Sequence, residues 1–262
     1  MPTALVTGAS EGIGLEFCKI MARRGYHVIL VARRQHLLEQ LSQRLTAEYG
    51  VQCSVIISDL SEPEAAQALF HATQQKGLQV DFLINNAGLL QNGYFTEIDL
   101  STQEKMMAVN MLALTSLTHL YANDMIARGG GHILNLASLA AWTPIPNQNV
   151  YAASKAYVLA FTQALANEFT ANNSGITATA LCPGFTATRM MNNPDQGGRL
   201  SIPQGMMQSA TDVAEQGIVA CLAGRTTLVP GISNRVTSWL AALLPRMPLV
   251  ALVGQFYRNN MR

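Results

Sequence analysis

Ser138, Tyr151 and Lys155 have the residue types and the spacing of a proton-transfer centre. Tyr151 and Lys155 are four residues apart in a segment of helical composition, so we expect the phenol and the ammonium on one face of a helix, about one turn apart. A free tyrosine has a pKa of about 10, and a fixed positive charge nearby lowers that pKa by stabilising the phenolate. Because a general acid works best when its pKa lies near the working pH, the pair predicts a proton donor.

A glycine-rich turn near the start of the chain adds a second function. The spacing of Tyr151 and Lys155 alone is also common on solvated helix faces, but here a strand-like run at 3–7 leads into Gly8, Gly12 and Gly14 and then into a helical segment. Such a strand–turn–helix lets the backbone approach a pyrophosphate at a helix N-terminus. A dinucleotide site and a proton donor in one chain together indicate hydride transfer at a carbonyl group.

These residues belong to a longer series of motifs. In chain order, the motifs are Thr7-Gly8-x3-Gly12-x-Gly14, Asp59-Leu60, Asn85-Asn86-Ala87-Gly88, Asn110, Ser138, Tyr151-x3-Lys155 and Pro183-Gly184. In type, order and spacing, the sequence resembles the classical short-chain dehydrogenases/reductases over nearly its whole length.

The resemblance implies a role for each catalytic residue. Ser138 is expected to bind the substrate oxygen, and Tyr151 to exchange a proton with it. Lys155 is expected to lower the pKa of Tyr151 and to bind the nicotinamide ribose. Asn110 is expected to hold a water that relays protons to Lys155.

The resemblance also implies the residues that hold the cofactor. Asp59 is expected to bind the adenine amine, Asn86 to Gly88 to border the adenosine ribose, and Thr186 with Thr188 to hold the carboxamide. The full expected set is Gly8, Ser10, Gly12, Ile13, Gly14, Arg33, Arg34, Asp59, Asn86, Ala87, Gly88, Tyr151, Lys155, Pro183, Gly184, Thr186 and Thr188. No metal site is expected.

The end of the second strand predicts which dinucleotide binds. NAD-selective enzymes place an acidic residue there for the ribose 2′-hydroxyl, whereas this chain has Arg33 and Arg34. A planar guanidinium suits a dianionic 2′-phosphate, so we expect NADP(H). The alternative is that both arginines belong to a surface turn. Some NADP-selective relatives also carry a basic residue before the second glycine, where this chain has Glu11.

Apolar strand-like runs alternate with helical segments along the chain. Strands are expected at 3–7, 27–32, 51–57, 80–85, 132–137, 176–182 and 226–229, and helices at 12–24, 34–49, 61–77, 101–128, 149–172 and 211–223, with Ser61 as a helix N-cap. Because parallel strands buried on both faces are near-continuously apolar, this predicts an α/β fold. We expect a Rossmann-type, doubly wound, parallel seven-stranded sheet with helices on both faces, forming one catalytic domain over residues 1–262.

Composition restricts the partners and the compartment. With 17 Lys and Arg against 16 Asp and Glu, the net charge of +1 gives no overall field for nucleic acid. Four scattered cysteines and a first strand that begins by residue 3 are typical of a cytoplasmic protein without a signal peptide. The family resemblance implies a homodimer or homotetramer.

Two segments bear on the substrate. Residues 189–210 contain Met190, Met191, Met206 and Met207, which predicts an adaptable lid and a lipophilic carbonyl substrate. The segment 232–262 is apolar but contains Pro245, Arg246 and Pro248, so it is not expected to span a membrane. It is expected to cover the substrate cleft or a subunit contact, and peripheral contact with a membrane stays open.

Two other functions also remain open. One is oxidation of an alcohol or hydroxysteroid by the same residues. The other is a non-catalytic dinucleotide sensor, which would have no need of Ser138, Tyr151 and Lys155.

Overall fold

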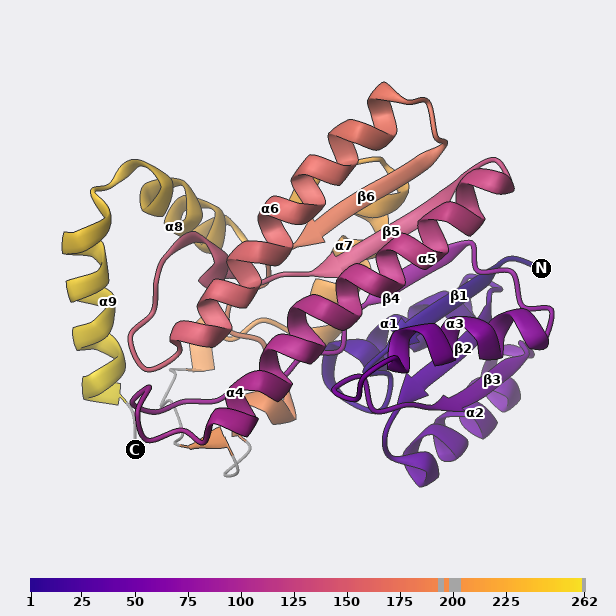
Figure 1. Ribbon diagram of the computed structural model, residues 1–262, viewed down its shortest axis with the longest axis horizontal. Helices are drawn as coiled ribbons and strands as arrows, with labels where there is room; N and C mark the ends of the chain where they lie inside the picture. Colours follow the sequence, from indigo (N-terminus) through magenta and orange to yellow (C-terminus); the bar gives the residue numbers. More distant parts are fainter. Residues whose placement is uncertain (193–195, 198–203, 261–262) are drawn as a thin grey trace.

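A parallel sheet between two layers of helices forms the centre of the computed structural model, which describes residues 1–192, 196–197 and 204–260 (Figure 1). The strands are β1 (Thr3–Thr7), β2 (His27–Ala32), β3 (Cys53–Ile57), β4 (Phe82–Asn85), β5 (Gly131–Leu136), β6 (Ile176–Leu181) and β7 (Thr227–Leu228). The α-helices are α1 (Gly12–Arg23), α2 (Gln35–Tyr49), α3 (Ala65–Gln75), α4 (Leu100–Met107), α5 (Leu114–Ala127), α6 (Asn149–Ala171), α7 (Ala210–Leu222), α8 (Ile232–Leu243) and α9 (Arg246–Asn260).

The strand order is β3-β2-β1-β4-β5-β6-β7, and every neighbouring pair is parallel. The sheet is thus wound outward in both directions from β1 and β4. Ligands of doubly wound sheets bind beyond the carboxyl ends of the strands at this change of direction. The predicted fold class, a seven-stranded Rossmann-type sheet covered on both faces, is confirmed.

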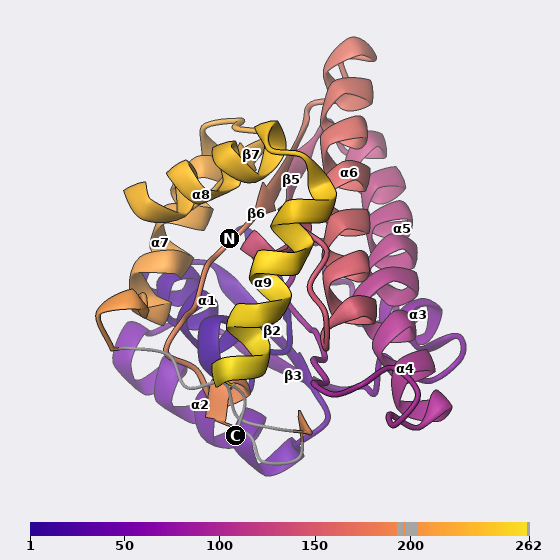
Figure 2. The same ribbon diagram turned by 90° about the vertical axis from the view of Figure 1, so that its left-hand side faces the viewer.

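The apolar strands form two cores, one on each face of the sheet. Ala4 and Val6 of β1 pack with α1, α2 and α7, whereas Leu5 points to the opposite face, which α3, α5 and α6 cover (Figure 2). Alternate residues of a strand face opposite sides, so covering both sides requires every residue of β1 to be buried.

Two expected helices differ from the structure. The helix expected at 61–77 begins at Ala65, because Asp59 Oδ1 accepts hydrogen bonds from both the backbone N–H and the hydroxyl of Ser61. Ser61 is therefore held in a local turn and is not the N-cap. The helix expected at 101–128 is interrupted by a π-helical segment, Ala108–Ala113, between α4 and α5.

The C-terminal segment forms α8 and α9, which lie beyond the carboxyl ends of the strands (Figure 1). Leu244 separates them in an extended conformation, as expected for a residue that precedes proline. Of the predicted lid at 189–210, short 3-10 turns at Arg189–Asn192 and Gln204–Met206 are described, whereas 193–195 and 198–203 lie outside the described residues.

Candidate active site

The glycine-rich turn connects β1 to α1 in the geometry that close backbone packing requires. Gly8 has a φ of 68°, in the left-handed region that favours glycine. An ideal Cβ on Gly14 would lie 2.2 Å from the Gly8 carbonyl oxygen, so no side chain fits there. The turn therefore brings the N-terminus of α1, with its free N–H groups, to the edge of the sheet where a phosphate can bind.

A cleft of about 330 Å³ opens beside this turn. It contains most of the predicted cofactor residues, namely Gly8, Ser10, Gly12, Ile13, Arg33, Arg34, Asp59, Asn86, Ala87, Gly88 and Thr188. Backbone at the carboxyl ends of the strands, a helix N-terminus and charged groups at the rim fit an extended dinucleotide. The cleft also includes Val109, Leu136, Arg189 and Gln196, which were not predicted. Leu136 was recognisable as the end of the strand before Ser138, but the other positions carry no local signal.

Both arginines after β2 lie at the rim of the cleft, where acidic groups contact them. Arg34 Nη2 lies 2.8 Å from Glu11 Oε2 and donates a hydrogen bond of 2.9 Å to Ser10 Oγ. Arg33 Nη1 lies 3.6 Å from Asp59 Oδ2, and Arg189 Nη1 lies 3.8 Å from Glu11. A phosphate placed here would therefore meet several guanidinium groups, with Glu11 as a competing anion.

The local contacts of Asp59 favour its ionised form by lowering its pKa. Partial burial raises its pKa, but hydrogen bonds from Ser61 and the charge of Arg33 outweigh this effect and hold the pKa below its usual value. The carboxylate thus remains an acceptor at neutral pH, which fits the predicted bond to an adenine amine.

Three of the four predicted catalytic side chains come together from two elements. Ser138 follows β5, and its hydroxyl oxygen accepts a hydrogen bond of 3.1 Å from the N–H of Ala140. Tyr151 and Lys155 project from α6, and the Tyr151 hydroxyl is hydrogen-bonded to the Ser138 side chain. The Ser138–Tyr151 contact joins positions 13 apart in sequence.

Lys155 connects this group to the cofactor cleft. Its Nζ donates a hydrogen bond of 2.7 Å to the carbonyl oxygen of Leu136 and lies 5.8 Å from the centre of the Tyr151 ring. Gly88 lies close by, since an ideal Cβ on it would be 3.5 Å from Lys155 Nζ. Leu136 and Gly88 both line the cleft, so the ammonium stands between the dinucleotide site and the phenol.

Burial dominates the acid–base properties of the pair. It raises the pKa of Tyr151, while the hydrogen bond from Ser138 lowers it. Burial also lowers the pKa of Lys155 to about 8, and the nearby Cys182 acts in the opposite direction. The causes that act on the pKa of Tyr151 in this structure are burial and the hydrogen bond from Ser138. That Lys155 lowers this pKa stays a prediction.

Asn110 lies in the middle of the π-helical segment and is fully buried. Its side chain accepts a hydrogen bond of 2.8 Å from Leu89 N and donates bonds of 3.0 Å to Leu89 O and to Ser154 Oγ. Ser154 in turn donates to the carbonyl oxygen of Tyr151. Asn110 thus ties the cleft wall to the catalytic helix, and π-helical segments are frequent at functional sites. Its predicted water relay stays a prediction.

In the segment after β6, Thr188 lines the cofactor cleft, whereas the other predicted cofactor residues do not. Thr188 lines the cleft and approaches Gly12, where an ideal Cβ would be 3.3 Å from Thr188 Cγ2. Pro183, Gly184 and Thr186 do not line the described cleft. The Pro183 carbonyl accepts a hydrogen bond from Leu139 N, and Thr186 Oγ1 donates one to the Gly184 carbonyl. Their predicted contacts with the nicotinamide therefore remain untested.

The C-terminal helix α9 packs beside the start of α6, the helix that carries Tyr151 and Lys155. Its Tyr257 is buried in a cluster with Ile145 and Ala152, against which Phe185 and Val253 pack. Burial raises the pKa of Tyr257, and the nearby Tyr151 adds to that rise. No sequence motif marked Tyr257 as part of the site.

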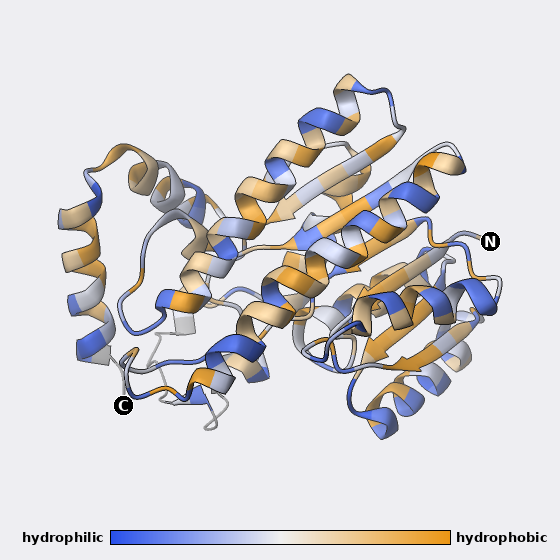
Figure 3. Ribbon diagram, in the orientation of Figure 1, coloured by the Kyte–Doolittle hydropathy of each residue, from blue (hydrophilic) through white to orange (hydrophobic). Residues whose placement is uncertain are grey.

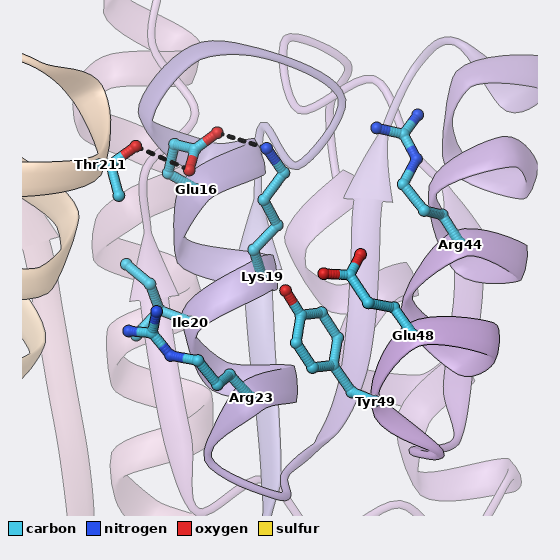
Figure 4. A pocket seen from close by; sticks show the side chains of 8 residues that line it. All are labelled: Glu16, Lys19, Ile20, Arg23, Arg44, Glu48, Tyr49 and Thr211. Carbon is cyan, nitrogen blue, oxygen red and sulfur yellow. Dashed lines mark hydrogen bonds and ion pairs between the residues drawn. The ribbon is translucent and has the colours of Figure 1, made fainter.

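A second hollow, of about 340 Å³, lies between α1, α2 and α7 (Figure 4). Its charged groups are in part paired, since Glu16 contacts Lys19 at 2.7 Å and accepts a hydrogen bond of 3.0 Å from Thr211. None of the predicted site residues lines it. We therefore assign the chemistry to the cleft beside the glycine turn.

Comparisons with known proteins agree with this geometry. The family model described as "short chain dehydrogenase" matches residues 2–197. A very-long-chain 3-oxoacyl-CoA reductase of Anas platyrhynchos is 36% identical over 191 residues, which are 71% of this chain but only 60% of that protein, so the chain spans less than two thirds of that relative. A 7beta-hydroxysteroid dehydrogenase of Clostridium sardiniense is 31% identical over 97% of this chain and 94% of its own.

The structure of a short-chain dehydrogenase from Sphingobium yanoikuyae in complex with NADPH superposes with a TM-score of 0.82, 29% identity and 96% coverage of both chains. The chain belongs to the short-chain dehydrogenase family of oxidoreductases, whose members bind a nicotinamide dinucleotide.

Proposed function

We propose that this protein is an NADPH-dependent reductase that converts a lipophilic ketone or aldehyde into the alcohol, with Tyr151 as the general acid. The observation that carries the proposal is the placement of Lys155. Its ammonium bonds to the carbonyl of Leu136, which lines the dinucleotide cleft, and lies beside the phenol that Ser138 holds. NADPH oxidation measured over a panel of ketones tests the proposal, and cofactor binding without any turnover would favour a sensor instead.

The residues divide the reaction among themselves. Ser138 and Tyr151 bind the carbonyl oxygen, and Tyr151 transfers its proton as negative charge develops there. The positive charge of Lys155 stabilises the phenolate that remains. The dinucleotide, when bound, supplies the hydride. Because burial raises the pKa of Tyr151, the phenol stays protonated at neutral pH and is ready to act as an acid.

The choice of NADPH rests on Arg33 and Arg34. Both lie at the cleft rim after β2, and no carboxylate occupies the NAD-type position at the end of that strand. The similar Sphingobium yanoikuyae enzyme is described in complex with NADPH, which supports the proposal.

The charge of Lys155 should make cofactor binding pH-dependent. With a pKa of about 8, Lys155 is protonated below that pH and loses its charge above it. Hydrogen bonds from charged donors are about twice as strong as neutral ones, so NADPH affinity should fall roughly fivefold between about pH 7 and pH 9. Fluorescence titration across this range measures the effect. Lys155→Met should show no such pH dependence, and an equal slope in both proteins would contradict the assignment.

The lipophilic substrate class rests on the cover that α9 forms. Tyr257, Val253, Ile145 and Phe185 form an apolar cluster with Ala152, the residue after Tyr151 on α6, and none of them lines the cofactor cleft. The names of two relatives, a very-long-chain 3-oxoacyl-CoA reductase and a 7beta-hydroxysteroid dehydrogenase, are consistent with large apolar substrates.

Substrate length should therefore change catalytic efficiency. In a homologous series of aliphatic ketones, each added methylene is expected to raise kcat/KM by up to about fourfold, which corresponds to about 0.8 kcal/mol of burial, until the pocket is full. Tyr257→Ala should flatten this profile. Leu252→Ala, at an exposed position of the same helix, should leave it unchanged. A flat profile in the wild-type protein would exclude the lipophilic pocket.

Oxidation of a hydroxysteroid or another alcohol is the second candidate. The observation that favours it is the 31% identity over nearly the whole chain with a 7beta-hydroxysteroid dehydrogenase. The same residues serve both directions, with Tyr151 then acting as the base. Rates with NADPH plus ketone and with NADP⁺ plus the matching alcohol, measured at the same pH, decide between them.

A further inference from the structure

The outward face of α8 is apolar although it is exposed to solvent. Ile232, Val236, Trp239, Leu240 and Leu243 recur at spacings of one, three and four residues, which place them on one side of the helix. Their exposed fractions are 75%, 51%, 65%, 43% and 63%. Leu244 and Met247 continue this surface across the turn into α9. We call these seven side chains the α8 surface.

The opposite side of α8 holds the helix in place. Ser238 and Ala241 are buried, and Asn234 Nδ2 donates hydrogen bonds to Gln208 Oε1 at 3.0 Å and to the Pro230 carbonyl at 2.9 Å. An ideal Cβ on Gly184 would lie 2.6 Å from Asn234, so the helix packs directly on the segment after β6. The apolar side chains are therefore presented outward by a fixed helix.

The charge around the α8 surface has one sign. Residues 216–262 contain no Asp or Glu, but they contain Arg225, Arg235, Arg246, Arg258 and Arg262. Arg235 and Arg246 are exposed and lie among the apolar side chains in sequence. Within residues 1–192, 196–197 and 204–260, neither forms an ion pair. The surface thus combines exposed apolar groups, including a tryptophan, with uncompensated cations.

A second copy of the chain fits this surface poorly. In a two-fold symmetric dimer the same patch meets itself, so the arginines of one copy would approach those of the other. The segment offers no side-chain carboxylate to pair with them. A bilayer with anionic headgroups offers both partners at once, negative charge for the arginines and an apolar layer for Trp239 and the leucines.

We propose that the α8 surface docks on anionic phospholipid membranes. The contact is peripheral, since no helix in the described part of the chain is long and apolar enough to cross a bilayer. In Figure 3, the end of α8 and the middle of α9 show apolar colours at one extremity of the molecule. Because α9 also carries Tyr257, which packs against Ala152 beside Tyr151, docking would place the proposed substrate site near the lipid surface; this step rests on the proposed function.

Vesicle co-sedimentation of the full chain tests the proposal independently of catalysis. The protein should sediment with vesicles of phosphatidylcholine plus phosphatidylserine, and less with phosphatidylcholine alone or at high salt. Trp239→Ala with Leu243→Ala should weaken binding at least tenfold, because both side chains would enter the interface. Arg235→Gln and Arg246→Gln should each weaken it roughly fivefold, about 1 kcal/mol.

Matched controls separate docking from general adhesion. Leu112→Ala removes another exposed apolar side chain, and Arg44→Gln another exposed arginine, so both variants should bind vesicles like the wild type. Circular dichroism and thermal melting verify that the α8 variants fold. Absence of vesicle binding by the wild-type protein would overturn the proposal. So would a dimer that Trp239→Ala with Leu243→Ala dissociates, if vesicle binding is missing, because the surface would then be a subunit interface.

Discussion

Replacing Tyr151 by Phe is expected to reduce carbonyl reduction by about 10²–10⁴-fold, the range that general acid–base catalysis contributes. The substitution keeps the ring, and with it the packing beside Lys155, but removes the hydroxyl that is hydrogen-bonded to Ser138. The substrate oxygen then has no proton donor at that position. Folding and NADPH binding should survive, because the cofactor cleft is lined by other residues. Turnover with a reactive ketone and NADPH fluorescence measure the two properties separately.

Tyr157→Phe is the matched control for this experiment. Tyr157 lies on the same helix, and its hydroxyl also has a side-chain partner, Thr115 Oγ1, at 2.8 Å. It is exposed and lies outside the cofactor cleft, so its loss should leave turnover close to that of the wild type. If Tyr151→Phe keeps more than about a tenth of wild-type turnover, another group supplies the proton and the proposed mechanism is wrong.

The parts of the fold that depend on local pattern could be predicted from the sequence. The apolar runs that became β1 and β2 are continuous because both faces of the sheet are covered, and this pattern is readable without coordinates. The glycine turn and the residues after each strand were likewise placed at one edge of the sheet, because carboxyl ends of parallel strands meet there. The cleft brings most of them together.

Features that depend on contacts distant in sequence could not be predicted. The π-helical segment around Asn110 interrupts a stretch whose residues all read as ordinary α-helix. Within it, Asn110 forms hydrogen bonds with Leu89 and Ser154. Tyr257 lies beside the catalytic helix α6 because α9 packs against Ile145 and Ala152. Neither contact leaves a periodic pattern in the chain. The helix start near Ser61 was wrong for a different, local reason, since Asp59 Oδ1 accepts hydrogen bonds from the N–H and the hydroxyl of Ser61 and holds it in a turn.

The pairing of Arg34 with Glu11 was also absent from the sequence interpretation, and it changes how cofactor choice should be tested. Glu11 was read only as the absence of a basic residue, whereas its carboxylate lies 2.8 Å from Arg34 and 3.8 Å from Arg189. A 2′-phosphate would compete with this carboxylate for the same guanidinium groups. The net gain from the arginines is therefore the difference between two charge-assisted contacts.

NADPH is nevertheless expected to bind more tightly than NADH, because a dianionic phosphate offers Arg34 and Arg33 more charge than one carboxylate each. A charge-assisted contact of about 1.5–3 kcal/mol corresponds to roughly 10–100-fold in affinity, so Arg34→Ala and Arg33→Ala should each lower NADPH affinity by up to that factor and change NADH affinity little. Glu11→Gln should tighten NADPH binding, since it removes the competing anion and keeps the side-chain size.

Arg44→Ala, at an exposed position on α2 outside the cofactor cleft, is the control and should affect neither dinucleotide. Fluorescence titration of all four variants with both dinucleotides gives the selectivity ratio directly. A ratio near one in the wild-type protein, or equal losses for NADPH and NADH in the arginine variants, would show that Arg33 and Arg34 form a surface turn without a role in selectivity.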